Sequence, residues 1–329
     1  MKRLVLTWAI SAFVAFSTSF AAASPPVTTL VSFDASLGQL PESLTRDDAG
    51  NLYISAGGTV YKFSTAHKLT TLATVPIPTG AFSVGVKVGP DGYIYLCSGA
   101  LFTSPNAAFI WRISPSGAVK VFATLPPTAF PNDIAFDEQG EMYVTDSFLG
   151  QIWKIDRRGN PSVWLQDSRL LGNPAAPVPV FHAFGANGIA LDASQRHLYV
   201  GNTDYGRILS IEIRNGRAAD IDVVVENDQL KGADGIAFDK RGLLYVAVNA
   251  LDRIATVDRR GFISIYAQGA PFDAPSSLVF GREHECRDEP TLYLSSFALY
   301  RANGFIPGTP HPSIQSIPVP FGGLDLDSH

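Results

Sequence analysis

The chain has 329 residues, of which 46% are hydrophobic and 17% charged, and its formal net charge is −5. This is the composition of a folded globular protein. The weak acidity, without a basic stripe, offers no electrostatic footprint for nucleic acid or an anionic membrane, so neither is an expected partner.

Residues 1–23 have the pattern of a secretory signal peptide. Two basic residues precede an apolar run over 4–20, and three alanines at 21–23 form a small-residue cleavage site. An uncleaved membrane anchor is the alternative, although the run is short for a spanning helix. We therefore expect an exported protein, periplasmic or extracellular, with one domain over 24–329 and no stable membrane insertion after cleavage.

A short motif recurs six times along the rest of the chain. It consists of an apolar stretch, a turn and a Leu/Ile/Met-Tyr pair, and its tyrosines are Tyr53, Tyr95, Tyr143, Tyr199, Tyr245 and Tyr293. Successive tyrosines therefore lie 42, 48, 56, 46 and 48 residues apart. A repeat of this length is typical of propellers and solenoids, in which each unit packs against its neighbours.

Each period reads as antiparallel β-structure. In the third period, residues 133–137 and 141–146 predict two strands around a turn, 151–156 a third strand with alternating apolar residues, and 161–165 a fourth at the outer edge. Four antiparallel strands in each of six periods predict an all-β, six-bladed β-propeller.

Two segments flank the repeats, residues 27–33 and 314–321. We expect them to share a blade and so to close the ring. A β-sandwich or a β-helix is the alternative architecture, and the repeat length disfavours both.

One position of the motif, which we call the slot, varies mainly among oxygen-bearing residues. It lies two residues before the leading aliphatic residue of the first strand and is occupied in turn by Glu42, Val84, Asn132, Asn187, Asp234 and Ser276. The first strand of every propeller blade lines the central channel, so these side chains are expected to form a ring around its axis.

Four of the six slots carry carboxylate or amide oxygens, which predicts a metal site formed by Glu42, Asn132, Asn187 and Asp234. Two carboxylates that converge on one axis repel each other unless a cation lies between them. Oxygen ligands without Cys or His favour Ca²⁺, with Mg²⁺ or Mn²⁺ as alternatives. For Asn132-Asp133, Asn187-Gly188 and Asp234-Gly235 an ordinary turn is the competing interpretation.

The slot motifs also carry a family resemblance. The segments concerned are Pro41-Glu42-Ser43-Leu44, Pro131-Asn132-Asp133-Ile134, Ala186-Asn187-Gly188-Ile189 and Ala233-Asp234-Gly235-Ile236. They resemble motifs of the senescence marker protein/gluconolactonase family, the calcium-dependent six-bladed propellers that include regucalcin. The resemblance implies that Glu42, Asn187 and Asp234 bind the metal and that Asn132 is either a further ligand or a substrate contact.

The chain departs from this family at Phe130. Sugar-lactone-hydrolysing members resemble one another in having an arginine here, two residues before the asparagine of the third blade. A phenyl ring offers apolar area where a guanidinium would bind hydroxyl groups. Other aromatic residues are expected on loops of the same face: Phe82, Phe102, Phe148, Phe181, Phe184 and Phe297. We therefore expect a small, partly apolar substrate, while packing of several of these rings between blades is the alternative.

These expectations describe an exported, metal-dependent hydrolase of lactones or esters, in which water attacks a carbonyl polarised by the cation. Asp234 and His182 are the candidate proton acceptors, although for His182 an ordinary surface histidine is the favoured interpretation. The candidate substrate contacts are Phe130, Asn132, Asp146, Phe148, Phe184 and Asn249. A non-catalytic binding propeller and a lyase, isomerase or cyclase with the same pocket are the alternative functions.

Overall fold

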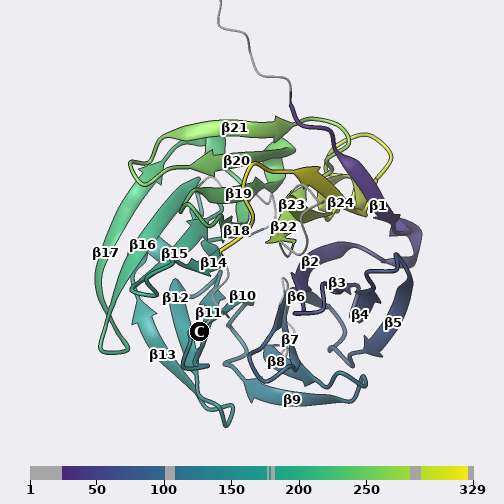
Figure 1. Ribbon diagram of the computed structural model, residues 1–329. Coiled ribbons are helices and arrows are strands. Elements are labelled where there is room, and N and C mark those ends of the chain that lie inside the picture. The colour runs from purple at the N-terminus through teal and green to yellow at the C-terminus, as the bar shows by residue number, and fades with distance from the viewer. Residues whose placement is uncertain (1–23, 101–107, 176–177, 179–181, 282–289, 325–329) are drawn as a thin grey trace, which may run out of the picture.

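The computed structural model describes residues 24–100, 108–175, 178, 182–281 and 290–324. The expected signal peptide lies outside the described residues, as do Phe102 and Phe181. Over the described ranges, no helix is long and apolar enough to cross a membrane. The strands in these ranges form six sheets of four antiparallel strands arranged in a ring (Figure 1), so the prediction of a six-bladed β-propeller is confirmed.

The first three blades follow one another along the chain. Blade one contains β2 (Pro41–Arg46), β3 (Leu52–Ala56), β4 (Thr59–Phe63) and β5 (Leu69–Thr74). Blade two contains β6 (Ala81–Val88), β7 (Ile94–Ala100), β8 (Phe109–Ile113) and β9 (Val119–Thr124). Blade three contains β10 (Pro131–Phe136), β11 (Met142–Asp146), β12 (Gln151–Ile155) and β13 (Pro161–Gln166).

The next two blades repeat this order. Blade four contains β14 (Ala186–Leu191), β15 (His197–Asn202), β16 (Arg207–Arg214) and β17 (Arg217–Glu226). Blade five contains β18 (Ala233–Phe238), β19 (Leu244–Val248), β20 (Arg253–Val257) and β21 (Ile263–Gln268).

Blade six joins the two ends of the chain. It contains β22 (Pro275–Phe280), β23 (Thr291–Ser296), β24 (Ser313–Pro318) and, as its outer strand, β1 (Thr28–Ser32). β1 pairs antiparallel with β24, so that Thr28 lies opposite Ser316. The expectation that the flanking segments share a blade is therefore confirmed, and opening the ring would require breaking the β1–β24 hydrogen bonds.

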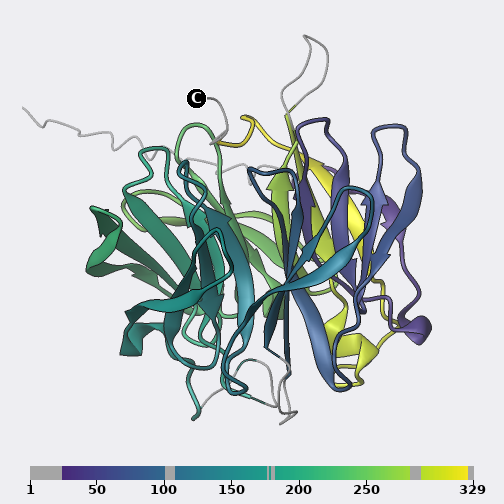
Figure 2. The same cartoon turned by 90° about the horizontal axis from the view of Figure 1, so that it is seen from below.

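The first strand of each blade lies next to the axis, and β2, β6, β10, β14, β18 and β22 each pack against the next one around the ring. We call them the inner strands. They all begin at one end of the axis, which we call the start face, and finish at the other, the end face. In Figure 2 the start face is at the bottom and the end face, with the C-terminal yellow segment, is at the top.

Short helical turns connect some of the strands. They are η1 (Ala35–Leu37), η2 (Ser168–Leu170), η3 (Asp228–Leu230), η4 (Asn249–Leu251) and α1 (Leu299–Ala302). Helix α1 follows β23 and lies at the start face.

The hydrophobic core lies between neighbouring blades. One cluster joins Tyr95 of blade two to Ile134, Val144 and Trp153 of blade three, all of them buried. A similar cluster joins blades four and five. This is why both faces of most strands are apolar: each sheet packs against a neighbour on either side.

The tyrosines of the repeat have a structural role in three blades. The hydroxyl of Tyr53 donates to Asp47 Oδ2 at 3.0 Å, and Tyr143 donates to Asp137 Oδ2 at 3.2 Å, with the same arrangement in blade two. Burial, together with this hydrogen bond to Asp47, raises the pKa of Tyr53 to about 12. In these three blades the tyrosine therefore holds the turn that ends the inner strand.

Candidate functional site

In all six blades the slot residue lies at a β-bulge. The pairing of β2 with β3 is shifted in register between Pro41 and Ser43, on either side of Glu42, and the other five inner strands are shifted at the corresponding place. A bulge turns a side chain out of the regular alternation of a strand. The structure thereby brings together the side chains that line one cavity at the start face: Glu42, Val84, Asn132, Asn187 and Asp234.

The alternative interpretation of the slot dipeptides as turns is wrong, because they lie inside β10, β14 and β18. Two of the glycines permit close approach of adjacent inner strands. A Cβ atom on Gly188 would lie 2.2 Å from the carbonyl oxygen of Asp234, and one on Gly235 would lie 2.7 Å from that of Ser276. Glycine is needed here because a side chain would force the inner strands apart.

Hydroxyl groups of the second strands position the slot backbone of the next blade. Thr145 Oγ1 donates to the carbonyl oxygen of Asn187 at 2.6 Å, and Ser295 Oγ donates to that of Glu42 at 3.0 Å. Ser276, the slot residue of blade six, also donates to Glu42 O, and it does not line the cavity. Each of these bonds joins two blades, so the ring of slot residues is held by tertiary contacts.

The two slot asparagines are oriented by hydroxyl partners. Asn132 Nδ2 donates to Ser147 Oγ at 2.9 Å, and Asn187 Nδ2 donates to Thr203 Oγ1 at 3.0 Å. Both hydroxyls in turn donate to backbone carbonyls of the next blade. The amide nitrogens are thus engaged, and within the described part of the chain no N–H or O–H group donates to either Oδ1 atom. These two oxygens remain available to a ligand.

The two slot carboxylates are buried, with 6% of Glu42 and 5% of Asp234 exposed. Burial is the main cause that raises the pKa of both groups, and the charges of Asp234 and Asp133 raise the pKa of Glu42 further. Glu42 Oε2 is buried and has no hydrogen-bond partner among the described residues. An unpartnered buried carboxylate oxygen beside a second carboxylate is costly without a cation.

Two successive hydrogen bonds hold the Asp234 carboxylate in place. Asn249 Nδ2 donates to Asp234 Oδ2 at 2.7 Å, and the hydroxyl of Tyr300 donates to Asn249 Oδ1 at 3.1 Å. Asn249 is the first residue of η4, directly after β19, and Tyr300 lies in α1. The sequence prediction placed Asn249 at the cavity, and the structure does so too.

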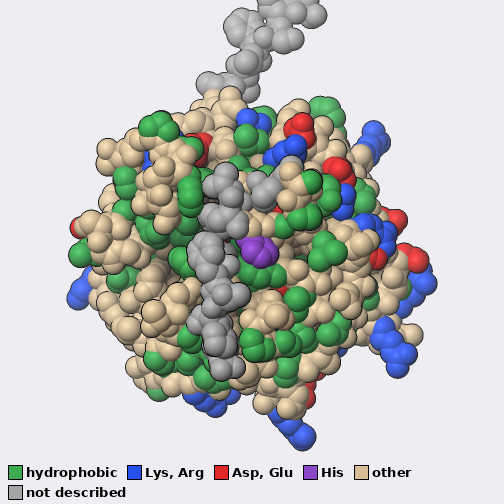
Figure 3. All heavy atoms as spheres, turned by 180° about the vertical axis from the view of Figure 1, so that it is seen from behind, with side chains coloured by type: hydrophobic (Ala, Val, Ile, Leu, Met, Phe, Trp, Pro, Cys, Tyr) green, Lys and Arg blue, Asp and Glu red, His purple; other side chains and the backbone are tan. Residues whose placement is uncertain are grey.

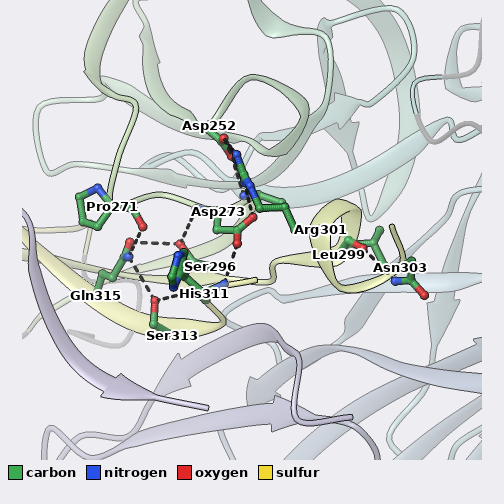
Figure 4. A network of polar contacts seen from close by, with 11 residues as sticks. Asp252, Pro271, Asp273, Ser296, Leu299, Arg301, Asn303, His311, Ser313 and Gln315 are labelled. Atoms are coloured by element: carbon green, nitrogen blue, oxygen red, sulfur yellow. Dashed lines mark hydrogen bonds and ion pairs between the residues drawn. The ribbon is translucent and has the colours of Figure 1, made fainter. Parts of the chain in front are cut away.

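Helix α1 is anchored by an arginine between two aspartates (Figure 4). Arg301 Nη1 lies 2.6 Å from Asp273 Oδ1, and Arg301 Nη2 lies 3.4 Å from Asp252 Oδ2. Asp273 also accepts a hydrogen bond from the backbone of His311. These contacts hold α1 over the cavity, where Leu299 and Tyr300 form part of the lining.

The rest of the cavity wall is aromatic. Phe82, Phe130, Phe184 and Phe297 line it, and Figure 3 shows hydrophobic side chains around the centre of this face, with most charged groups near the rim. The Phe130 ring lies 5.2 Å from that of Phe184. The cavity has a volume of about 50 Å³, which suits an ion and a few solvent molecules, so a substrate body would lie in its aromatic mouth.

Three residues predicted for the site do not line this cavity. Asp146 accepts hydrogen bonds from the backbone of Phe130, Phe148 and Leu149 and from the indole of Trp153, so its carboxylate is used to hold the loop. Phe148 packs behind Phe130, with ring centroids 4.8 Å apart. Asp146 and Phe148, both predicted as substrate contacts, therefore support the residues that line the cavity. For Phe148 this is the alternative of a ring packed within the protein.

His182 is also outside the cavity. It is exposed, its ring stacks on Phe148 with centroids 3.9 Å apart, and its Nδ1 lies 2.8 Å from the carbonyl oxygen of Ala183. The structure therefore places it against the aromatic cluster, and it is not among the residues that line the cavity. Of the two candidate proton acceptors, Asp234 alone lines the cavity.

Sequence reasoning missed Thr203, Leu299 and Tyr300, which also line the cavity. Thr203 directly follows β15 and corresponds to Ser147 after β11, so alignment of the second strands could have found it. Helix α1 interrupts the repeat pattern, and no period-based signal could have placed Tyr300 against Asn249.

The donor set fits a hard divalent cation. It contains two carboxylates and two amide oxygens, and the described residues contain no group of three or more His, Cys, Asp or Glu that could hold a metal instead. Ca²⁺ takes carboxylate and amide oxygens readily and completes its shell with water. The unpartnered Glu42 Oε2 is the observation of this structure that agrees best with such an ion.

The six blades surround an axial cluster of carboxylate and amide oxygens, so the protein is a propeller with a polar site at one end of its axis. The family model described as SMP-30/Gluconolactonase/LRE-like region matches residues 168–298. The resemblance expected from the slot motifs is therefore confirmed over blades four and five and the start of blade six.

Three comparisons show what the chain is similar to. It is 24% identical over 229 residues to lactonase drp35 of Staphylococcus haemolyticus, covering 67% of this chain and 67% of that protein. The calcium-binding protein regucalcin of Agrobacterium tumefaciens is 14% identical, with a TM-score of 0.63 over 91% of this chain and 97% of that one. Virginiamycin B lyase of Staphylococcus aureus is 17% identical, with a TM-score of 0.56 over 79% and 78%. At these identities the structural likenesses show the fold alone.

Proposed function

We propose that this protein is a calcium-dependent hydrolase of lactones or esters whose substrates carry an apolar body. The observation that carries the proposal is the convergence of Glu42, Asn132, Asn187 and Asp234, from four blades, on one cavity with an aromatic mouth. The similarity to a lactonase supports the reaction class, and the similarity to a calcium-binding propeller supports the ion.

The cation would be held by the carboxylates of Glu42 and Asp234 and by the amide oxygens of Asn132 and Asn187. When bound, it would act as a Lewis acid that polarises the carbonyl group and stabilises the negative charge developing on its oxygen. Mg²⁺ suits the same oxygen ligands less well, because the two asparagines are fixed by their hydroxyl partners and Mg²⁺ demands near-ideal octahedral geometry.

The chain's own groups perform the remaining tasks. Asn249 holds Asp234 through Oδ2, and we assign to the Asp234 carboxylate the role of accepting the proton from the attacking water. Phe130, Phe184 and Phe297 bind the apolar part of the substrate and exclude bulk water from the reacting carbonyl.

The lining explains why we favour apolar substrates over sugar lactones. Each hydroxyl of a sugar lactone needs a hydrogen-bond partner once it is removed from water. Phe130 is 2% exposed and lies between Phe148 and Phe184, so it offers none. Export, proposed from the leader over residues 1–23, would expose the site to the higher calcium concentrations found outside the cytosol.

The test is turnover of a panel of aliphatic lactones, aryl esters and gluconolactone by the purified protein, in calcium and in chelator. We expect hydrolysis of apolar substrates that stops in chelator and in Asp234→Asn. Asp220→Asn is the matched control because the side chain of Asp220 is 73% exposed and distant from the axis, and it should retain wild-type turnover.

A reaction in isotopically labelled water separates hydrolysis from a non-hydrolytic reaction in the same pocket. Hydrolysis places one solvent oxygen in the product carboxylate, whereas a lyase or isomerase places none. Turnover without incorporation would exclude the hydrolase proposal, and turnover that is indifferent to both chelator and Asp234→Asn would exclude the metal site as its cause.

A further inference from the structure

A second and larger cavity lies in the other half of the channel. It has a volume of about 560 Å³ and is lined by the final residues of all six inner strands, among them Arg46, Lys87, Phe136, Leu191, Phe238 and Phe280. Because the slot residues lie where these strands begin, this cavity opens at the opposite face of the ring. Its size is that of a small-molecule site.

Its charged lining is entirely cationic. Arg46, Lys87 and Lys240 line the cavity, from blades one, two and five, and no Asp or Glu of the described chain does so. Asp47, which directly follows Arg46, uses its carboxylate to accept hydrogen bonds from Asn51 and Tyr53. A cavity with cations on several sides and apolar walls raises the local concentration of anions.

Lys87 is the most informative of the three cations. It is partly buried in β6, and the described residues give its amine neither a hydrogen bond nor an ion pair, although the charge of the partly buried Asp133 lies near enough to interact with it. Arg46 uses Nε and Nη1 on the carbonyl oxygens of Phe280 and Asp47, which fixes the guanidinium while leaving further N–H groups. Both therefore retain donors for a ligand.

The walls between the cations are apolar. They include the rings of Phe136, Phe238 and Phe280 and the side chains of Leu278 and Leu324. An inorganic anion would bind to the cationic side chains and leave the apolar walls in contact with water. An organic anion with an aliphatic or aromatic body would use both, because burial of its apolar surface adds to the charge-assisted hydrogen bonds.

We propose that the end-face cavity binds an amphipathic organic carboxylate, with its head group on Lys87 and Arg46 and its apolar body against Phe136, Phe238 and Phe280. The site is separate from the axial oxygen ring, and the inference does not depend on the proposed hydrolysis.

The test is calorimetric titration of the full-length protein with octanoate at low salt, with octyltrimethylammonium as the probe of opposite charge. We expect octanoate to bind, octyltrimethylammonium not to bind, and Lys87→Met to weaken octanoate by about tenfold or more, the loss of one charge-assisted hydrogen bond. Lys87→Arg should retain binding. Lys120→Met, at an exposed position of the outer strand β9, is the matched control and should bind as wild type.

Two further variants locate the site. Asp234→Asn should bind octanoate unchanged, and loss of binding in it would assign the ligand to the axial ring and overturn the proposal. Unchanged affinity in Lys87→Met would overturn it as well. The chain continues beyond Leu324 with Asp325 and Asp327. If octanoate bound to a variant ending at Leu324 but not to the full-length protein, we would conclude that the acidic residues Asp325 and Asp327 of the chain occupy the cavity. The proposal of a small-molecule carboxylate would then be wrong.

Discussion

Replacing Glu42 by glutamine should stabilise the protein in chelator and remove most of its stabilisation by calcium. Folding takes the Glu42 carboxylate out of water and places it near Asp234 and Asp133, which raises its pKa. A carboxyl group whose pKa is higher in the folded than in the unfolded state destabilises the fold once the pH exceeds about 4, its unfolded value. This cost grows with pH until the folded pKa is passed.

The size of both stability effects can be estimated from the Glu42 carboxylate and from the binding of calcium. Each unit by which the folded pKa exceeds the unfolded value costs about 1.4 kcal/mol at high pH, and glutamine of nearly the same shape avoids that cost. Calcium at about 100 times its dissociation constant stabilises the folded state by about 2.7 kcal/mol. For a chain of this size that corresponds to a rise in Tm of about 4 °C. The variant, with one carboxylate instead of two in the site, should show little of that rise.

The assay is thermal unfolding of wild type and Glu42→Gln at pH 5 and pH 8, each in chelator and in calcium. Glu138→Gln is the matched control, because Glu138 is exposed and, among the described residues, its carboxylate accepts a hydrogen bond from the neighbouring Gln139 alone. The reasoning is refuted if Glu42→Gln keeps the full calcium-induced rise, or if in chelator at pH 8 it is less stable than wild type.

Three further predictions concern the groups around the ring. Asn249→Ala leaves Asp234 and Tyr300 buried without their partner, so unfolding by urea should show a loss of about 2–4 kcal/mol together with weaker calcium binding. Gly188→Ala should cost about 1–3 kcal/mol, since its Cβ would lie 2.2 Å from a backbone oxygen, whereas Gly201→Ala, with its nearest contact at 3.3 Å, should cost less; equal losses would contradict this account. In chelator, the raised pKa values of the two axial carboxylates should make the wild type less stable as pH rises from about 4 towards neutrality, and a stability that rises with pH over this window would show that other groups dominate.

Much of the architecture was predictable because propeller signals are local. The alternation of apolar residues, the turn glycines and the period of the tyrosines are each contained within one blade, and a single blade cannot bury its faces alone. The pairing of β1 with β24 followed from the same logic, since the two flanking segments supplied the two outer strands that the sixth blade lacked. The slot residues were found because they recur in register with that period.

The set of side chains that line the cavity at the start face was harder to predict, because it depends on contacts between neighbouring blades. The bulge at each slot, the hydroxyl of Thr145 on Asn187 and the approach of Gly188 to Asp234 join residues far apart in the sequence. Asp146 ended the expected strand, yet four nearby donors use its carboxylate, and His182 lies in a loop whose path no repeat specifies.

The amino-acid sequence by itself determined the number of blades, their strand order, the closure of the ring and which side chains could reach the axis, because these depend on short-range patterning. Only the tertiary structure decided that Tyr300 and α1 support Asp234 and that a separate cationic cavity occupies the other end of the channel. The physical reason is that closure of the ring, and no local preference, determines which side chains meet at each end of the axis.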